Sequence, residues 1–374
     1  MDRTAGSLLT ELARHHAATV EAASVCPAFR RRLSSVAPGR LAANADRGCN
    51  RFLDYPRHLR SIADRYDVFH IVDHSYAHLV HHLPADRTVV TCHDLDAFRS
   101  LLYPADEPRS WAFKAMTRHV LAGLRRAAYV TCDTAAIGEE IVAHDLVSPD
   151  RVVVAPVGVG DQFSTNFHLE AERDVAQLVA APAGAVEALH VGSTIPRKRV
   201  DVLLRAVATV RREMPQAHLV RVGGPFTAEQ DQLLSALDLA GHVSILPRID
   251  DARLAAVYRR ASILVLPSDR EGFGLPIVEA MACGTAVAAS DLPVLREVGG
   301  EVARYFPAGD PDACARQMLA LLRERVARPE EWTARRQQGV ARTRRFTWSR
   351  FADRLSGLYS ELSRRRGSVA ACRA

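Results

Sequence analysis

Several features are scarce in this chain of 374 residues, and each absence narrows what the protein can be. Lysine occurs only at Lys114 and Lys198, so nearly all of the basic side chains are arginine, a bias typical of a GC-rich genome. No dense basic stripe with interleaved aromatic residues occurs, which argues against nucleic-acid binding. No apolar run approaches the roughly 18 residues that a membrane-spanning helix needs.

The cysteines give no sign of disulfide bonds. The seven cysteines are scattered, odd in number and never paired as CxxC, so we expect free, mostly buried thiols rather than a zinc site or a disulfide framework. The residues after Met1 show no signal-peptide pattern, so we expect a cytoplasmic protein. A net charge of +6 suits an anionic partner: nucleotide phosphates, an anionic glycan or the inner face of an acidic membrane.

Strand-like apolar runs alternate with helical patterns along the chain, which predicts an α/β protein with parallel sheets and enough length for two domains. Strands are predicted at 68–72, 88–92, 128–132 and 151–154 in the first half, and at 188–191, 219–222, 243–246, 263–266 and 286–290 in the second. A capping-box pattern at Thr227 and Gln230 predicts a helix that ends near Gly241. The weakly patterned stretch 164–187 is interpreted as an interdomain linker.

The most informative segment, EGFGLPIVEAMACGT, runs from Glu271 to Thr285. It follows a predicted buried strand, places two glycines in a loop, and puts Pro276 at a first helical position. The free N–H groups of the loop and the helix dipole both point above Gly274 and Leu275, which suits an anion, most often a phosphate.

Two carboxylates frame that anion position. Glu271 lies at the end of the strand, where ligands gather in α/β sheets, and Glu279 lies about one turn into the helix. A phosphate alone would not favour two carboxylates, whereas sugar hydroxyls donate hydrogen bonds to them, so the predicted ligand is a nucleotide sugar. The alternative is a generic Rossmann-like loop and helix with solvated glutamates.

From Ser268 to Thr285 the chain resembles the signature of retaining glycosyltransferases of family 4, which have the GT-B architecture. The resemblance implies two Rossmann-like, doubly wound domains that face a cleft: an acceptor-side domain at 1–165 and a nucleotide-sugar domain at 183–346. It also implies a C-terminal helix, 349–374, that packs back on the first domain. The family's first domain opens with a strand and a glycine loop, whereas a helical pattern begins here at Gly6, so we expect that first strand to be missing.

A second motif, Gly192-Ser-Thr-Ile-Pro-Arg-Lys-Arg199, follows the predicted strand that ends at Val191. Arg197 and Lys198 are thus expected near the carboxyl end of a strand, where cations neutralise a diphosphate. The resemblance implies that they bind the donor diphosphate and stabilise the charge on the leaving group, so no metal or other cofactor is required. The alternative is a solvated charged turn.

The resemblance assigns further residues to donor binding. Glu279 is expected to hold the ribose hydroxyls. Glu271 is expected to face the donor sugar, where it either holds the sugar hydroxyls or stabilises positive charge; the resemblance does not make it a nucleophile. The other expected donor-site residues are Gly192, Gly223, Arg248 near the base, and the loop residues Gly272, Phe273, Gly274 and Leu275.

In the first domain, His93 and Asp94 directly follow the predicted strand that ends at Cys92, and the family has a similar histidine there. They are expected to contact the donor sugar, with a purely structural pair as the alternative. A metal site at Asp94 and Asp96, or at the histidines of 74–82, is a weaker hypothesis. The stretch 111–126 mixes basic and apolar residues; an ordinary packed amphipathic helix is favoured over a membrane-surface helix.

The sequence therefore predicts a retaining glycosyltransferase. It would move a hexose of the mannose or glucose type from a UDP- or GDP-sugar to a hydroxyl of a growing polysaccharide or lipid-linked glycan. A non-catalytic nucleotide-sugar-binding homologue, acting as a partner or regulatory subunit, is the main alternative. A sugar phosphorylase with pyridoxal phosphate would need a Schiff-base lysine, which neither Lys114 nor Lys198 is placed to supply.

Overall fold

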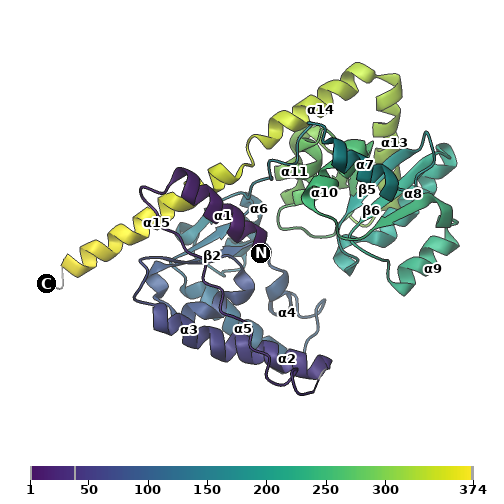
Figure 1. Cartoon of the computed structure of the whole chain (residues 1–374). Helices are drawn as coiled ribbons and strands as arrows, with labels where there is room; N and C mark the ends of the chain where they lie inside the picture. Colours follow the sequence, from purple (N-terminus) through teal and green to yellow (C-terminus); the bar gives the residue numbers. More distant parts are fainter. Residues whose placement is uncertain (1, 38, 372–374) are drawn as a thin grey trace. The chain divides into compact units, whose positions relative to one another are not determined.

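A computed structural model describes residues 2–37 and 39–371 and divides the chain into two compact units (Figure 1). The first unit consists of Met1–Val157 with Trp348–Ala374, and the second of Gly158–Thr347. Each unit is built around one parallel sheet, which confirms the predicted α/β class with two parallel-sheet domains.

The first unit contains a four-stranded parallel sheet whose order follows the chain, β1-β2-β3-β4. Its strands are β1 (Phe69–Ile71), β2 (Thr88–Cys92), β3 (Tyr129–Cys132) and β4 (Val152–Val154). Every residue of β2 and β3 is buried, as expected of parallel strands that are covered on both faces. Parallel neighbours need crossover connections, and α5 (Trp111–Arg126) and α6 (Ala135–Ala143) supply them after β2 and β3.

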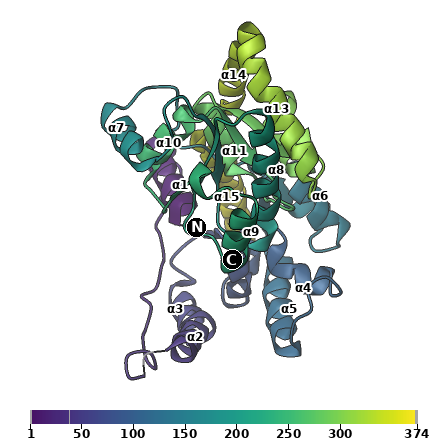
Figure 2. The same cartoon turned by 90° about the vertical axis from the view of Figure 1, so that its right-hand side faces the viewer.

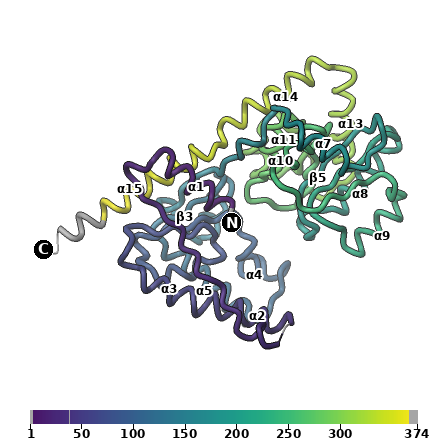
Figure 3. The backbone as a smooth tube through the Cα atoms, viewed as in Figure 1, coloured from purple at the N-terminus to yellow at the C-terminus, as the bar shows by residue number. Residues whose placement is uncertain are grey.

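The remaining α-helices of the first unit are α1 (Asp2–His15), α2 (Arg40–Cys49), α3 (Tyr55–Ile62), α4 (Arg99–Leu102) and α15 (Trp348–Ala371). In the described part of the chain no strand precedes β1, and residues 16–37 lead from α1 toward α2 without helix or strand (Figure 3). The sheet accordingly shows no reversal of strand order.

The C-terminal helix α15 belongs to the first unit and lies beside α1 (Figure 1). Tyr359 shares a 2.6 Å hydrogen bond with Nδ1 of His70 on β1, and the hydroxyl of Tyr129 on β3 donates to Glu361 at 2.7 Å. These bonds attach α15 directly to the strands of the sheet.

The second unit contains a six-stranded parallel sheet of order β10-β9-β8-β5-β6-β7. Its strands are β5 (Val186–Val191), β6 (Ala217–Val222), β7 (Val243–Leu246), β8 (Ile263–Leu266), β9 (Ala286–Ser290) and β10 (Arg304–Phe306). The winding direction reverses at β5, which lies between β8 and β6. In such sheets ligands bind at the carboxyl ends of the strands that flank the reversal.

Eight α-helices are described in the second unit: α7 (Leu169–Leu178), α8 (Val200–Glu213), α9 (Ala228–Ala236), α10 (Asp251–Arg260), α11 (Leu275–Ala282), α12 (Pro293–Gly299), α13 (Pro311–Ala327) and α14 (Pro329–Thr343). Helices α8 and α13 pack side by side (Figure 2) and share one apolar core cluster with the sheet. The predicted capping box of Thr227 and Gln230 is present at the start of α9.

The stretch 164–187 is not a linker, so that interpretation was wrong. It contains α7, which packs on α10 within the second unit and buries Ala171 and Val175. Glu172 of α7 accepts a 2.7 Å hydrogen bond from Arg259 of α10. Only two small apolar side chains, four positions apart, mark the buried face of α7, and that signal is too weak for a helix to stand out in the sequence.

Candidate functional site

The carboxyl ends of β5 and β8 bring Lys198, Arg197 and Glu271 together. Nζ of Lys198 lies 2.5 Å from Oε1 of Glu271, and Nη1 of Arg197 lies 3.4 Å from Oε2. The hydroxyl of Ser268 donates a third bond to Oε1 at 2.7 Å. Because β5 and β8 are parallel neighbours, their following loops leave the sheet at the same edge.

This cluster is an ion pair with little access to water: the side chain of Glu271 is 7% exposed and that of Lys198 12%. Arg197 also donates to the main-chain oxygen of Arg270 at 2.8 Å, which fixes its guanidinium beside the carboxylate. An ammonium has three donors, so Lys198 can bind both Glu271 and an incoming anion. The cluster therefore offers cations and a carboxylate within one ligand's reach.

The loop after β8 leads into α11 through Gly274, whose φ of +86° is left-handed. A Cβ on Gly274 would lie 2.6 Å from a methyl group of Leu295, so only glycine fits there without rearrangement. No side chain caps α11, whose first residue is Leu275. Its first N–H groups and positive dipole end therefore suit an anion.

The other residues of this loop differ in how far they are exposed to solvent. Gly272 is half-buried, whereas Phe273 is buried and packs edge-on against Phe346, with ring centroids 5.5 Å apart. Phe273 thus contributes packing under the loop. Glu279 is buried in α11, and its Oε2 accepts a 2.9 Å hydrogen bond from the hydroxyl of Tyr258 on α10.

The loops after β5 and β6 are in direct contact through two predicted glycines. The N–H of Gly192 donates to the oxygen of Val222 at 3.0 Å. Gly223 has a φ of +139°, and a Cβ there would lie 2.0 Å from the oxygen of Gly192. Arg248, by contrast, is exposed after the edge strand β7, and no described contact joins it to the Lys198–Glu271 cluster.

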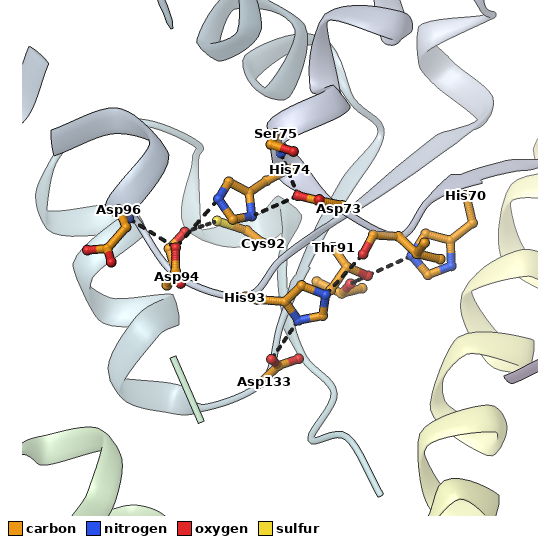
Figure 4. Close-up of polar contacts among 12 residues, drawn as sticks. His70, Asp73, His74, Ser75, Thr91, Cys92, His93, Asp94, Asp96 and Asp133 are labelled. Carbon is orange, nitrogen blue, oxygen red and sulfur yellow. Dashed lines mark hydrogen bonds and ion pairs between the residues drawn. The ribbon is translucent and has the colours of Figure 1, made fainter. Parts of the chain in front are cut away.

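In the first unit, His93 directly follows β2, and its ring contacts residues that directly follow β1 and β3; Figure 4 shows the contact with Asp133. Its Nδ1 lies 2.7 Å from Oδ2 of Asp133, directly after β3, and its Nε2 lies 3.0 Å from the oxygen of Val72, directly after β1. Burial opposes protonation, but the hydrogen bond and the charge of Asp133 outweigh it and raise the pKa of His93 to about 9. His93 is therefore an imidazolium that donates from both ring nitrogens at neutral pH.

Asp133 is a site residue that sequence reasoning missed. Its position directly after a predicted strand, at the same edge as His93, was the available signal. Asp94 lies at this edge too, where its Oδ1 accepts the N–H of Asp96 at 3.0 Å and lies 3.6 Å from Nε2 of His74 (Figure 4). Burial lowers the pKa of His74.

The weaker hypotheses can be placed in the structure as well. The histidine-rich stretch forms a 3-10 helix, His74–His82, in which His78 contacts the oxygen of Arg51 at 3.1 Å. Within the described ranges, no three His, Cys, Asp or Glu side chains are arranged to hold a metal ion.

Helix α5 is a packed amphipathic helix, as favoured, and buries Thr117, Val120, Leu121, Gly123 and Leu124. Its first residue, Trp111, is nevertheless 83% exposed. No described helix is both long and apolar enough to cross a membrane.

Comparison with known families agrees with this architecture. The family described as Glycosyltransferase Family 4 matches residues 1–163, and the family described as Glycosyl transferases group 1 matches residues 185–324. The two units thus define a GT-B protein. The chain belongs to the group 1, family 4 glycosyltransferases, as the motif at Glu271 predicted.

Two curated relatives and one solved structure indicate the range of similar proteins. Phosphatidyl-myo-inositol mannosyltransferase of Mycobacterium leprae is 39% identical over 172 residues, which cover 45% of this chain and 44% of the relative. D-inositol 3-phosphate glycosyltransferase of Saccharomonospora viridis is 33% identical over 285 residues, 66% of this chain and 64% of the relative. HepE of Anabaena in complex with UDP-glucose superimposes with a TM-score of 0.68 at 18% identity, with 82% of each chain covered, and shows the shared fold.

The matched part of this chain spans less than half of the mannosyltransferase and less than two thirds of the inositol phosphate enzyme.

Proposed function

We propose that the chain is a glycosyltransferase that moves a hexose from a nucleotide diphosphate sugar to a hydroxyl of a glycan or lipid-linked acceptor. The observation that carries this proposal is the cluster of Lys198, Arg197 and Glu271 at the carboxyl ends of β5 and β8. It combines cations for a diphosphate with a carboxylate for sugar hydroxyls at the reversal point of the sheet.

The proposed chemistry uses electrostatic stabilisation. As the bond between sugar and phosphate breaks, negative charge develops on the nucleoside diphosphate that leaves. Lys198, Arg197 and the uncapped N–H groups of α11 would stabilise that charge, while Glu271 would hold sugar hydroxyls. The proposal requires no metal or other cofactor, and it assigns retention of configuration at the anomeric carbon.

Relatives guide the choice of substrates. The two relatives are named for transfer of mannose to a phosphatidylinositol and for glycosyl transfer to an inositol phosphate, and the HepE structure holds UDP-glucose. We therefore propose a donor sugar of the mannose or glucose type on GDP or UDP. A lipid-linked acceptor would also account for peripheral membrane contact through the exposed Trp111.

The test is donor hydrolysis and binding with purified protein and a panel of UDP-, GDP- and ADP-sugars. We expect slow nucleotide release from one donor, with loss of that release in Glu271→Ala. Glu330→Ala, at an exposed glutamate in the first turn of α14, is the matched control and should behave like the wild type. Binding of a donor without any turnover, also with acceptors present, would favour a non-catalytic nucleotide-sugar-binding homologue that acts as a partner or regulatory subunit.

A further inference from the structure

Arg221 is a fully buried arginine in the middle layer of the second unit. It lies on β6 in register with His190 of β5, one residue before the carboxyl end of the strand. A guanidinium stays charged in proteins, and burying a charge is costly unless a partner compensates it. Among the described residues Arg221 has no carboxylate partner; its guanidinium lies over the ring of Phe226, 5.0 Å from the centroid.

The hydrogen bonds of Arg221 go instead to main-chain oxygens of two loops. Nη2 donates to the oxygen of Gly192 at 3.0 Å, and Nη1 donates to the oxygen of Gly224. These glycines follow β5 and β6, the strands next to the reversal of strand order. Arg221 therefore ties together the two loops that leave the sheet where a ligand is expected.

The carbonyl of Gly192 is held from two sides. Arg221 binds its oxygen, and Gly223 packs so closely against it that a Cβ would come within 2.0 Å. The peptide unit is planar and trans, so the N–H of Ser193 points opposite to that oxygen. Since the oxygen faces the buried guanidinium, the N–H of the exposed Ser193 faces the open side of the turn that carries Lys198.

We propose that Arg221 is a positioning residue for the donor diphosphate: by holding the Gly192 carbonyl inward it directs the N–H of Ser193 toward the phosphate oxygens. The buried charge of Arg221 also adds to the positive field of Lys198 at this edge. The inference rests on the proposed function, because it deepens the role of the same diphosphate site.

The surroundings of Arg221 agree with an anion as the missing partner. His190, its neighbour across the strands, is fully buried, and neither ring nitrogen has a hydrogen-bond partner within the described chain. Burial and the nearby charges of Arg221 and Lys198 lower the pKa of His190 to about 3. The histidine is therefore neutral and adds no charge, while Arg221 has main-chain oxygens but no carboxylate as partners among the described residues.

The experiment compares binding of a nucleoside diphosphate, UDP or GDP, with binding of the matching nucleoside by calorimetry. We expect Arg221→Met to weaken binding of the diphosphate on the order of 10- to 100-fold, which is the range for hydrogen bonds to charged groups. Binding of the nucleoside should change much less. Arg221→Lys, which keeps the charge but cannot reach both carbonyls in the same geometry, should recover only part of the loss.

Two further sets of variants separate positioning from stability. Arg211→Met is the matched control, because Arg211 also donates to two main-chain oxygens, those of Pro215 and Ala217, at the opposite end of β6. Arg211→Met should lower thermal stability without a selective loss of affinity for the diphosphate. Ser193→Pro removes the proposed N–H donor at an exposed position and should weaken the diphosphate far more than Ser193→Ala, which keeps it.

The outcomes are distinct. If wild-type protein binds UDP or GDP and Lys198→Ala weakens that binding, but Arg221→Met and Ser193→Pro change diphosphate and nucleoside alike, the positioning role is wrong and the proposed function stands. If wild-type protein binds neither diphosphate, the proposed function is overturned and the inference falls with it.

Discussion

The ammonium nitrogen of Lys198 lies 2.5 Å from Oε1 of Glu271, although the two residues come from loops that follow different strands of the sheet. Both side chains are largely shielded from water, so neither charge is well solvated without the other. The pair places a cation and a carboxylate side by side where a nucleotide sugar is proposed to bind.

Replacement of Lys198 should affect turnover more than folding, because Glu271 keeps other partners. We expect Lys198→Met to lower the rate of donor hydrolysis about 100-fold or more, because a preorganised cation is lost where charge develops. Arg197 and Ser268 would still contact Glu271, so the unfolding temperature should fall only modestly. Arg323→Met, which breaks an exposed ion pair with Glu213, is the control; turnover of Lys198→Met at the control's level would contradict the prediction.

The contact between Gly223 and Gly192 gives a second prediction, about stability. In Gly223→Ala the new Cβ would collide with a main-chain oxygen, and φ would stay left-handed. We therefore expect the free energy of unfolding to fall by about 3 kcal/mol or more. In Gly224→Ala the new Cβ would have no atom within 4 Å, so the only cost is the strain of a φ of +95°. The free energy of unfolding should fall by about 1 kcal/mol. Unfolding curves of both variants, beside Gly241→Ala in open space, test the ranking.

The exposed first turn of α5 gives a third prediction, about membranes. Trp111 is 83% exposed and Phe113 38%, and Arg118 lies on the exposed part of the same helix. Aromatic side chains favour the membrane interface, and arginine favours anionic headgroups. We expect Trp111→Ser to lower co-sedimentation with vesicles that contain anionic lipid several-fold at fixed salt. Trp348→Ser on α15 is the control, and equal losses in both variants would argue against a role for this turn.

Much of the fold could be predicted because parallel strands leave a strong trace in sequence. The apolar run Ile263–Leu266 and the run Thr88–Cys92, which is rich in β-branched residues, are buried throughout, and the structure places strands at those residues. The motif at Glu271 was equally clear, since a glycine loop between a strand and a helix has few alternative explanations. What these patterns fixed is local: one strand, one loop and one helix at a time.

The missed features depend on residues that meet only in three dimensions. β10 is three residues long and shows no distinct apolar run, and α7 buries only small side chains. Asp133 stands out only because it contacts His93, which follows a neighbouring strand, and Arg221 only because it binds carbonyls of two loops. A single arginine within an apolar strand looks like an exposed residue in sequence, and only the packing shows that it is buried.

His93 and Asp133 allow a prediction with a definite direction in pH. The pKa of His93 is about 9 in the folded chain, above the ordinary histidine value near 6.5, so its contribution to stability is fully present below pH 6.5. That contribution, on the order of 3 kcal/mol, is lost as the pH rises through about 9. The ring signals of His93, followed by NMR between pH 5 and about 10, should titrate with the raised value.

The Asp133→Asn variant tests the cause of that shift. Without the carboxylate, burial is no longer outweighed, and the pKa of His93 should fall to its ordinary range or below. The loss of stability between neutral pH and pH 9 should disappear in the same variant. Asp86→Asn, at an exposed carboxylate of the same unit, should leave the titration of His93 unchanged. A His93 that still titrates near 9 in Asp133→Asn would show that a group other than Asp133 holds its proton, and the imidazolium could not then be assigned to this pair.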